Sequence, residues 1–335
     1  MKKALIGFMI CMGIAAAAAL SSPAFAAVTG ACSGCHTMHN SQDGTTPLGG
    51  SATPQGHLTL SSCIGCHSGT GVGDAPLVDG TYNTDSCAGG TFNPSGTAAD
   101  TMIHNVAFNA LTGLDTDTAF SGGLAPGAST GLNLGSGSTD ADNLVCAGAN
   151  GCHGDTTAGK DNDAGIQGFH HGTKPGWRFL QAASDHDAID GIGASDYEVA
   201  MSDGWTSGDP HNVYKSGDNG INTLCANCHP NFHGTGNTQA SGNWIRHPTD
   251  NAITALADSN NIVEDYRDHP FAFDTPAAGD YTIATAGANV ACVSCHRAHG
   301  SDYPDILRWD YALQSAGSTT VSYGCLGCHT AQQGP

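Results

Sequence analysis

The residues with the clearest chemistry are pairs of cysteines followed directly by a histidine. Two thiols at the spacing Cys-x-x-Cys-His can add to the two vinyl groups of haem, while the adjacent imidazole ligates the iron from its proximal face. Zinc sites and disulfides would not require a histidine after every second cysteine. The motif occurs five times, at Cys32, Cys35 and His36; Cys63, Cys66 and His67; Cys225, Cys228 and His229; Cys292, Cys295 and His296; and Cys325, Cys328 and His329.

A sixth site has a wider spacing. Five residues separate Cys146 from Cys152, and His153 follows. The two glycines in this stretch would let the longer loop fold back on itself. The alternative is a structural disulfide, either between these two cysteines or with Cys87. Of the 14 cysteines, ten lie in regular motifs and one in the N-terminal apolar segment, which leaves an odd three. We therefore expect six haems c, with five as the minimum, and a free or intermolecular thiol at Cys87. The sites are numbered 1 to 6 in chain order.

The other histidines can supply the second axial ligands. Six proximal histidines leave eleven of the 17, whereas the whole chain has six methionines. This surplus predicts bis-His ligation and low reduction potentials, because methionine ligation raises them. His39 and His299 come three residues after a proximal histidine, an offset that would let each ligate a neighbouring haem. The candidates are His39, His57, His104, His170, His171, His211, His233, His247 and His299, and His186 and His269 complete the eleven.

The N-terminus has the pattern of an export signal. Two lysines precede an apolar run, and Ala24-Phe25-Ala26 matches a signal-peptidase site, so residues 1–26 are predicted to be a cleaved signal peptide. An uncleaved membrane anchor is the alternative. No later segment is apolar enough to span a membrane. These features predict a secreted protein that passes through the periplasm.

The charge balance excludes nucleic acid as a partner. The chain has 10 Lys+Arg against 30 Asp+Glu, a formal net charge of −20, and a nucleic-acid surface would need the opposite sign. Half of the cations are arginines placed among the haem sites, and we expect them to pair with haem propionates.

The composition predicts an unusual interior. Aromatic residues are only 7% of the chain, whereas glycine accounts for 47 residues, too little bulky apolar material for ordinary cores. The predicted fold is a multihaem cytochrome c: mostly coil and turns with few short helices, wrapped around a stacked haem chain. Its expected segments are 27–75 with sites 1 and 2, a Gly/Ser/Ala-rich insert at 76–145 with a distal histidine, 146–220 with site 3, and 221–335 with sites 4 to 6.

Two stretches also resemble a known family. Cys-Ser-Gly-Cys-His-Thr-Met-His-Asn-Ser-Gln near the N-terminus, and the haem-site segments from Leu224 to Trp309, are similar to exported multihaem c-type cytochromes of dissimilatory metal-reducing bacteria. The resemblance implies a hexahaem outer-surface protein that polymerises head to tail into a nanowire. It also implies a histidine of one subunit ligating a haem in the next, and electron transfer to redox partners and extracellular acceptors.

Two other functions use the same motifs. A monomeric periplasmic or outer-surface electron carrier needs the same haems. A multihaem reductase needs an open iron beside acid–base groups, often marked by a lysine in place of the proximal histidine, and the chain has no Cys-x-x-Cys-Lys. We therefore expect an electron-transfer protein and not an enzyme.

Overall fold

The structure is a computed structural model of the whole chain. It describes residues 28, 31–37, 56–59, 63–67, 75–80, 87–93, 101–104, 106, 144–160, 162–172, 174, 176–181, 188–192, 212–236, 246–253, 269–277, 287–315 and 323–329. The predicted signal peptide lies outside these residues, as do His39, His186 and His211. None of the described helices is long and apolar enough to cross a membrane.

Short helices and coil make up most of the described chain, as the composition predicted. The helices are α2 (Cys63–His67), α3 (Asn162–Ile166), α4 (Ile221–Ala226) and α5 (Cys325–Cys328). Single 3-10 turns span Cys32–Gly34, Gly56–Leu58, Trp177–Phe179, Pro230–Phe232, Cys292–Ser294, Pro304–Ile306 and Tyr311–Leu313.

Two small sheets accompany the helices. Strands β1 (Val145–Ala147) and β2 (Gly151–His153) form a parallel pair. A four-stranded sheet has the order β3 (Gly191–Ile192), β4 (Val213–Lys215), β5 (Phe271–Phe273) and β6 (Ala288–Val290). In it β4 and β5 are parallel, and the two outer pairs are antiparallel.

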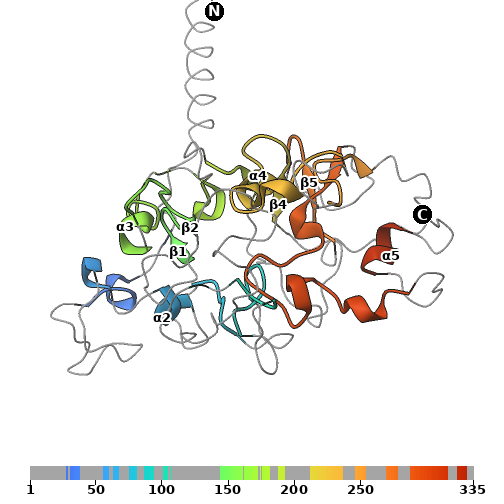
Figure 1. The fold of residues 1–335 in the computed structure, drawn as a ribbon. Helices are drawn as coiled ribbons and strands as arrows, with labels where there is room; N and C mark the ends of the chain where they lie inside the picture. The colour runs from blue at the N-terminus through green and yellow to red at the C-terminus, as the bar shows by residue number, and fades with distance from the viewer. Residues whose placement is uncertain are drawn as a thin grey trace, which may run out of the picture.

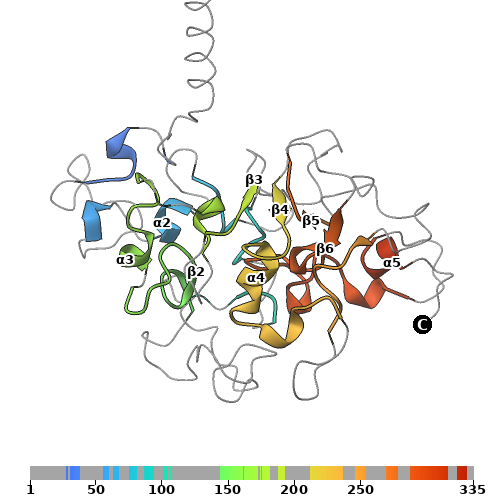
Figure 2. The same cartoon turned by 90° about the horizontal axis from the view of Figure 1, so that it is seen from above.

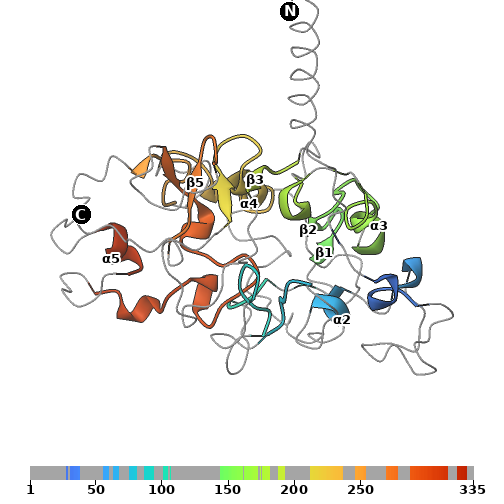
Figure 3. The same ribbon diagram turned by 180° about the vertical axis from the view of Figure 1, so that it is seen from behind.

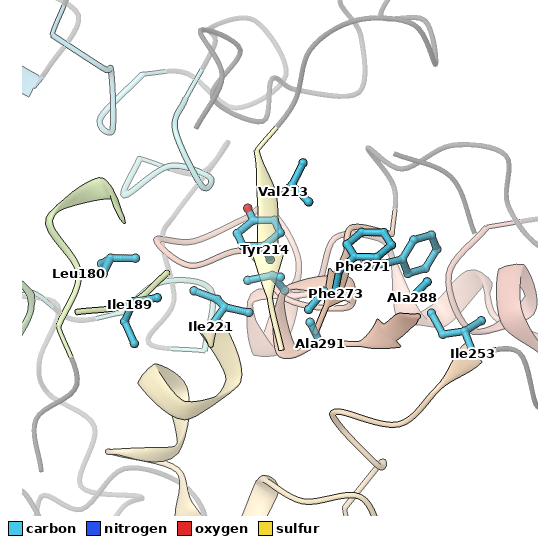
Figure 4. Close-up of a cluster of buried hydrophobic side chains, with 12 residues drawn as sticks. Leu180, Ile189, Val213, Tyr214, Ile221, Ile253, Phe271, Phe273, Ala288 and Ala291 are labelled. Carbon is cyan, nitrogen blue, oxygen red and sulfur yellow. The ribbon is translucent and has the colours of Figure 1, made fainter. Parts of the chain in front are cut away.

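The four-stranded sheet carries a side-chain core (Figure 4). All three residues of β5 are buried, and Phe271 and Phe273 are each 2% exposed, so this strand is covered on both faces. Burial of each phenylalanine contributes about 2–3 kcal/mol. The prediction that haem alone would replace a core therefore needs correction, because sheet residues pack one beside sites 4 and 5, where Leu224 and Val293 join it.

The attachment sites run from one end of the described fold to the other. All three ribbon views place the sites of the first 70 residues at one end and α5, with site 6, at the opposite end (Figures 1, 2 and 3). The β1–β2 pair and α3 lie beside the N-terminal sites, and the four-stranded sheet lies between them and α5 (Figure 2). The fold therefore spreads its haem motifs along its length.

Candidate haem-binding sites

Four of the regular motifs are each wound into a single turn closed by the same bond. The histidine N–H donates to the carbonyl of the first cysteine over 2.8–3.0 Å at His36, His229, His296 and His329. This turn brings the first cysteine and the histidine, four residues apart, onto one side of the backbone. At site 2 the whole motif is the helix α2. Local geometry thus presents two thiols and one imidazole together.

The widened site reaches a similar arrangement through β1 and β2. A backbone loop joins Cys146 in β1 to Cys152 in β2, and His153 ends the pair. A Cβ on Gly151 would lie 2.7 Å from the Val145 carbonyl, so the two strands approach too closely for any larger residue. Both cysteines are free thiols, as are all other cysteines in the described part of the chain. The alternative of a Cys146–Cys152 disulfide therefore has no support in this structure.

Five proximal histidines each face a second histidine from a distant part of the chain. Their ring centroids are 5.9–6.5 Å apart. The facing pairs are His36 with His171, His67 with His170, His153 with His299, His229 with His104, and His329 with His247.

This separation suits an iron atom between the two rings. An imidazole nitrogen binds a first-row metal at about 2.0 Å and lies about 1.1 Å from its ring centroid, so two axial imidazoles place their centroids about 6.2 Å apart. The observed range of 5.9–6.5 Å brackets this value. Direct ring packing can give similar centroid distances, but it does not explain why each pair contains one motif histidine. The donors present therefore fit bis-His haem at five sites, including the widened one.

Hydrogen bonds fix which ring nitrogen is available for iron. A carbonyl oxygen can only accept, so an Nδ1 bonded to it carries the proton, and Nε2 keeps its lone pair for a metal. Seven histidines donate from Nδ1 to a backbone carbonyl over 2.6–3.1 Å, namely His36, His67, His104, His153, His247, His296 and His299.

Burial keeps His104, His170 and His299 neutral. Burial, together with the nearby rings of His229 and His153 respectively, lowers the pKa of His104 to about 4 and that of His299 to about 3. Burial likewise lowers the pKa of His170 to about 4. Neutral imidazole is the form that ligates a metal, so the rings are ready to bind near neutral pH.

Cysteines of consecutive sites are neighbours in space. They form five pairs, and in each pair one cysteine lies close enough to the other to shift its pKa. The pairs are Cys35 with Cys66, Cys63 with Cys146, Cys152 with Cys228, Cys225 with Cys292, and Cys295 with Cys328. Each pair joins one site to the next in sequence. The six sites therefore form one row in chain order, which agrees with their spread along the fold (Figures 1 and 3).

A polar network, which the sequence reasoning did not find, joins sites 4 and 5. Asp250 accepts hydrogen bonds from the Gly217 N–H at 3.0 Å and from Asn222 Nδ2 at 2.8 Å, and its Oδ2 lies 2.8 Å from His233 Nε2. Asn222, in α4, accepts through Oδ1 from the Cys292 N–H at 2.7 Å. Burial raises the pKa of the Asp250 carboxyl, but these hydrogen bonds outweigh it and hold the pKa below its ordinary value.

Three further histidines have other neighbours. His233, predicted as an iron ligand, has its Nε2 engaged with Asp250, so the structure does not support that prediction. His57 is exposed, and its carbonyl accepts from His36. His269, the buried member of the three, packs against Trp309 with the ring centroids 5.1 Å apart, and its Nε2 donates to the Gly324 carbonyl.

Two of the five arginines are deeply buried near site 5. Arg297 and Arg308 are each 2% exposed, and the charge of Arg308 lies close enough to lower the pKa of His296. Arg308 also donates through Nε to the Val293 carbonyl. A buried guanidinium needs anionic or carbonyl partners, so both residues remain candidates to bind a haem propionate.

Several known proteins are similar to this chain. A family model described as the doubled CXXCH motif matches residues 285–334. The curated C-type cytochrome OmcS of Geobacter sulfurreducens is 26% identical, with the match covering 92% of this chain and 86% of the relative. Two solved structures also match: the Outer Membrane Cytochrome S Filament from Geobacter sulfurreducens, 22% identical over 88% of each chain with a TM-score of 0.48, and the OmcS nanowires from the same organism, 18% identical over 87% and 86% with a TM-score of 0.49.

The motifs, the facing imidazoles and the similarity along the chain lead to one conclusion. Six attachment sites stand in a row, and five of them have two imidazoles at the spacing that a haem iron requires. The prediction of a haem-bearing fold made mostly of coil and short helices is confirmed. The chain has the attachment motifs of a multihaem c-type cytochrome and is similar along most of its length to OmcS.

Proposed function

We propose that this protein carries electrons along a row of six bis-His haems as the subunit of a secreted, extracellular filament. The observation that carries the proposal is the row itself: consecutive attachment sites adjoin one another, and the first and last lie at opposite ends of the described fold (Figure 1). When bound, haem c supplies a one-electron iron couple. A row that reaches both ends of a subunit suits the passage of electrons from one subunit to the next.

The protein's own residues hold and insulate the haem positions. The cysteines of each motif would anchor the group covalently, and the facing histidines would hold its iron at sites 1, 2, 3, 4 and 6. Backbone carbonyls keep Nδ1 protonated, which leaves Nε2 for the metal. Two histidines at each of these five sites would leave no place on the iron for a substrate, which supports an electron carrier over the reductase alternative.

The surroundings of the site 5 histidine, His296, favour a polymer over a monomeric carrier. Among the described residues, no second histidine ring is found facing His296, and the proposed ligands of the other five sites are already paired. The remaining histidines in the described part of the chain have other surroundings: His233 is engaged with Asp250, His57 is exposed beside site 1, and Nε2 of His269 donates to the Gly324 carbonyl. We assign the missing ligand to His39 of a neighbouring copy, because the family resemblance implies ligand sharing and the segment that contains His39 is one of the two that carry the resemblance.

A head-to-tail arrangement follows from this assignment. His39 belongs to the site 1 region, whereas site 5 lies toward the C-terminal end of the row (Figures 1 and 2). Contact between these two different surfaces is heterologous, and such a contact generates an open filament unless its rotation closes a ring. The ligand would then link the haem rows of successive subunits.

Electron microscopy of the purified holoprotein tests the filament. We expect helical filaments from the wild-type protein, whereas His39→Ala should give separate particles together with one haem that lacks its sixth ligand. His57→Asn is the matched control: it removes an exposed imidazole from the same region, tolerates the positive φ of this position and should leave filaments intact. Discrete wild-type particles at every concentration would instead favour the monomeric carrier, which needs the same haems.

A further inference from the structure

Three short turns share a backbone conformation that most residues avoid. Two consecutive residues in each turn have positive φ: His57 and Leu58 at 57° and 59°, Arg178 and Phe179 at 53° and 63°, and Asp305 and Ile306 at 60° and 50°. We call them the left-handed turns. The segments are 56–59, 177–180 and 304–307.

Each left-handed turn holds one proximal histidine by the same two hydrogen bonds. The carbonyl of its first left-handed residue accepts from the histidine Nδ1, over 3.1 Å at His36, 3.0 Å at His153 and 2.7 Å at His296. The carbonyl of its second left-handed residue accepts from the N–H that follows the histidine, over 2.8, 2.6 and 2.9 Å in the same order. The residue after the turn forms an antiparallel bridge with the histidine in all three cases.

Sequence proximity does not explain the recurrence. The accepting carbonyl lies 21, 25 and 9 residues after its histidine at sites 1, 3 and 5. Site 3 has the widened cysteine spacing, yet its histidine is held in the same way. Site 2 differs, because His67 donates to the Pro76 carbonyl, and the His67 carbonyl accepts from Val78. Among the described residues, the shared turn is therefore found at sites 1, 3 and 5 and not at site 2.

The residues in these turns are poorly suited to the conformation. Turns with two positive φ values favour Asn-Gly or Asp-Gly, because other side chains crowd the backbone. Here the pairs are His-Leu, Arg-Phe and Asp-Ile, and a β-branched residue such as Ile306 is an outlier at positive φ. The intrinsic backbone preference of these residues cannot stabilise the turns, so contacts with the rest of the protein must do so. The contacts that all three turns share are the paired hydrogen bonds to the histidine segment.

We propose that the left-handed turns are positioning elements that set the proximal ligand of sites 1, 3 and 5. By accepting from Nδ1, each turn fixes the tautomer and the ring orientation and makes Nε2 a more basic ligand, which stabilises the ferric state and lowers the reduction potential. The main-chain carbonyls accept these hydrogen bonds, so the hydrogen bonds depend on side-chain identity only through backbone conformation. The proposal rests on the proposed function, since it requires haem at these histidines.

Substitutions at one position can separate backbone shape from side-chain chemistry. Asp305→Pro fixes φ near −65° and cannot form the turn at site 5. Asp305→Gly removes the same side chain but adopts positive φ without strain. Asp305→Val, which disfavours positive φ without forbidding it, is the milder variant if the proline protein does not mature. Each full-length holoprotein is compared with the wild type by intact mass, by spectroelectrochemical titration and by the EPR g-values of the oxidised protein.

The Asp305 carboxylate lies close enough to His296 to act on its charge, and all three variants remove it, so Asp305→Gly is the reference for the other two. We expect Asp305→Pro, or Asp305→Val in its place, to shift one of six midpoint potentials upward relative to Asp305→Gly and to change one set of low-spin g-values that Asp305→Gly leaves unchanged. Six potentials equal to those of the glycine protein, or the same change of g-values in the glycine protein, would overturn the inference. A failure of the proposed function has a different signature, namely fewer than six haems by mass in the wild-type protein itself.

Discussion

Replacement of His299 tests the assignment of the facing imidazoles most directly. His299 faces His153 across 6.2 Å at the widened site, and in His299→Ala that site would keep only its proximal ligand. One of six haems should therefore become high-spin in the oxidised protein, and one of six should bind carbon monoxide when reduced. The other five should remain low-spin, because none of the other four facing pairs includes this residue and site 5 takes its second ligand from a neighbouring copy in the filament.

The cost in stability can be estimated from the same contacts. The His299 ring packs on Phe92 at 4.9 Å, and its Nδ1 donates to the Ala88 carbonyl over 2.6 Å. Loss of this packing and of the buried hydrogen bond should reduce the free energy of unfolding by about 2–4 kcal/mol. For a chain of this size the melting temperature should fall by about 5–10 °C.

His269→Ala is the matched control. His269 is also buried, at 2% exposure, packs against Trp309 and donates to a backbone carbonyl, so its loss should destabilise the protein by a similar amount. All six haems should nevertheless remain low-spin. EPR of the oxidised proteins counts the high-spin haems, and carbon monoxide difference spectra of the reduced proteins count the haems that bind carbon monoxide. A fully low-spin His299→Ala protein, or a high-spin haem in His269→Ala, would refute the ligand assignment.

Three further predictions concern the widened site, acid stability and a close backbone approach. Serine at both Cys146 and Cys152 should lower the haem count from six to five by intact mass, and an unchanged mass increment would contradict haem attachment there. The pKa of Asp250 in the folded protein is held below its ordinary value of 3.8. The ionised carboxylate therefore stabilises the fold fully above about pH 4, and this stabilisation is lost as the pH falls through the pKa of the folded state. Asp250→Asn should weaken this acid dependence in denaturation curves measured from pH 6 to pH 3. A methyl group on Gly90, which has φ of 96°, would collide with the Gly300 carbonyl, so Gly90→Ala should lower the free energy of unfolding by about 3 kcal/mol. A melting temperature equal to the wild-type value would argue against that contact.

The sequence was sufficient for the attachment sites because their chemistry is local. Two cysteines and a histidine within one turn suffice to predict a haem, and His153 showed the same type of facing partner despite its wider cysteine spacing. The pairing of imidazoles could not be predicted, because it depends on contacts between remote segments. His104 donates to the carbonyl of Ala298, 194 residues away, and no periodicity in either segment indicates this approach.

Other features were missed for different physical reasons. The four-stranded sheet consists of strands of two or three residues, too short for an alternating pattern to be visible. The left-handed turn at Arg178 and Phe179 contains no glycine or asparagine, so turn chemistry gives no signal. His233 looked like a ligand because it follows a haem motif closely, but its partner, Asp250, comes from a separate segment.

The first two sites are joined in an unusual way, since His170 faces His67 and the next residue, His171, faces His36. A single peptide bond thus links the second ligands of two metal centres, and their Cα atoms cannot separate beyond about 3.8 Å. Thermal motion elsewhere in the subunit can change this separation very little. An insertion of one residue between the two histidines would preserve every attachment motif and yet disrupt the alignment of both centres, so we expect evolution to tolerate changes of chain length almost anywhere in this region except at that bond.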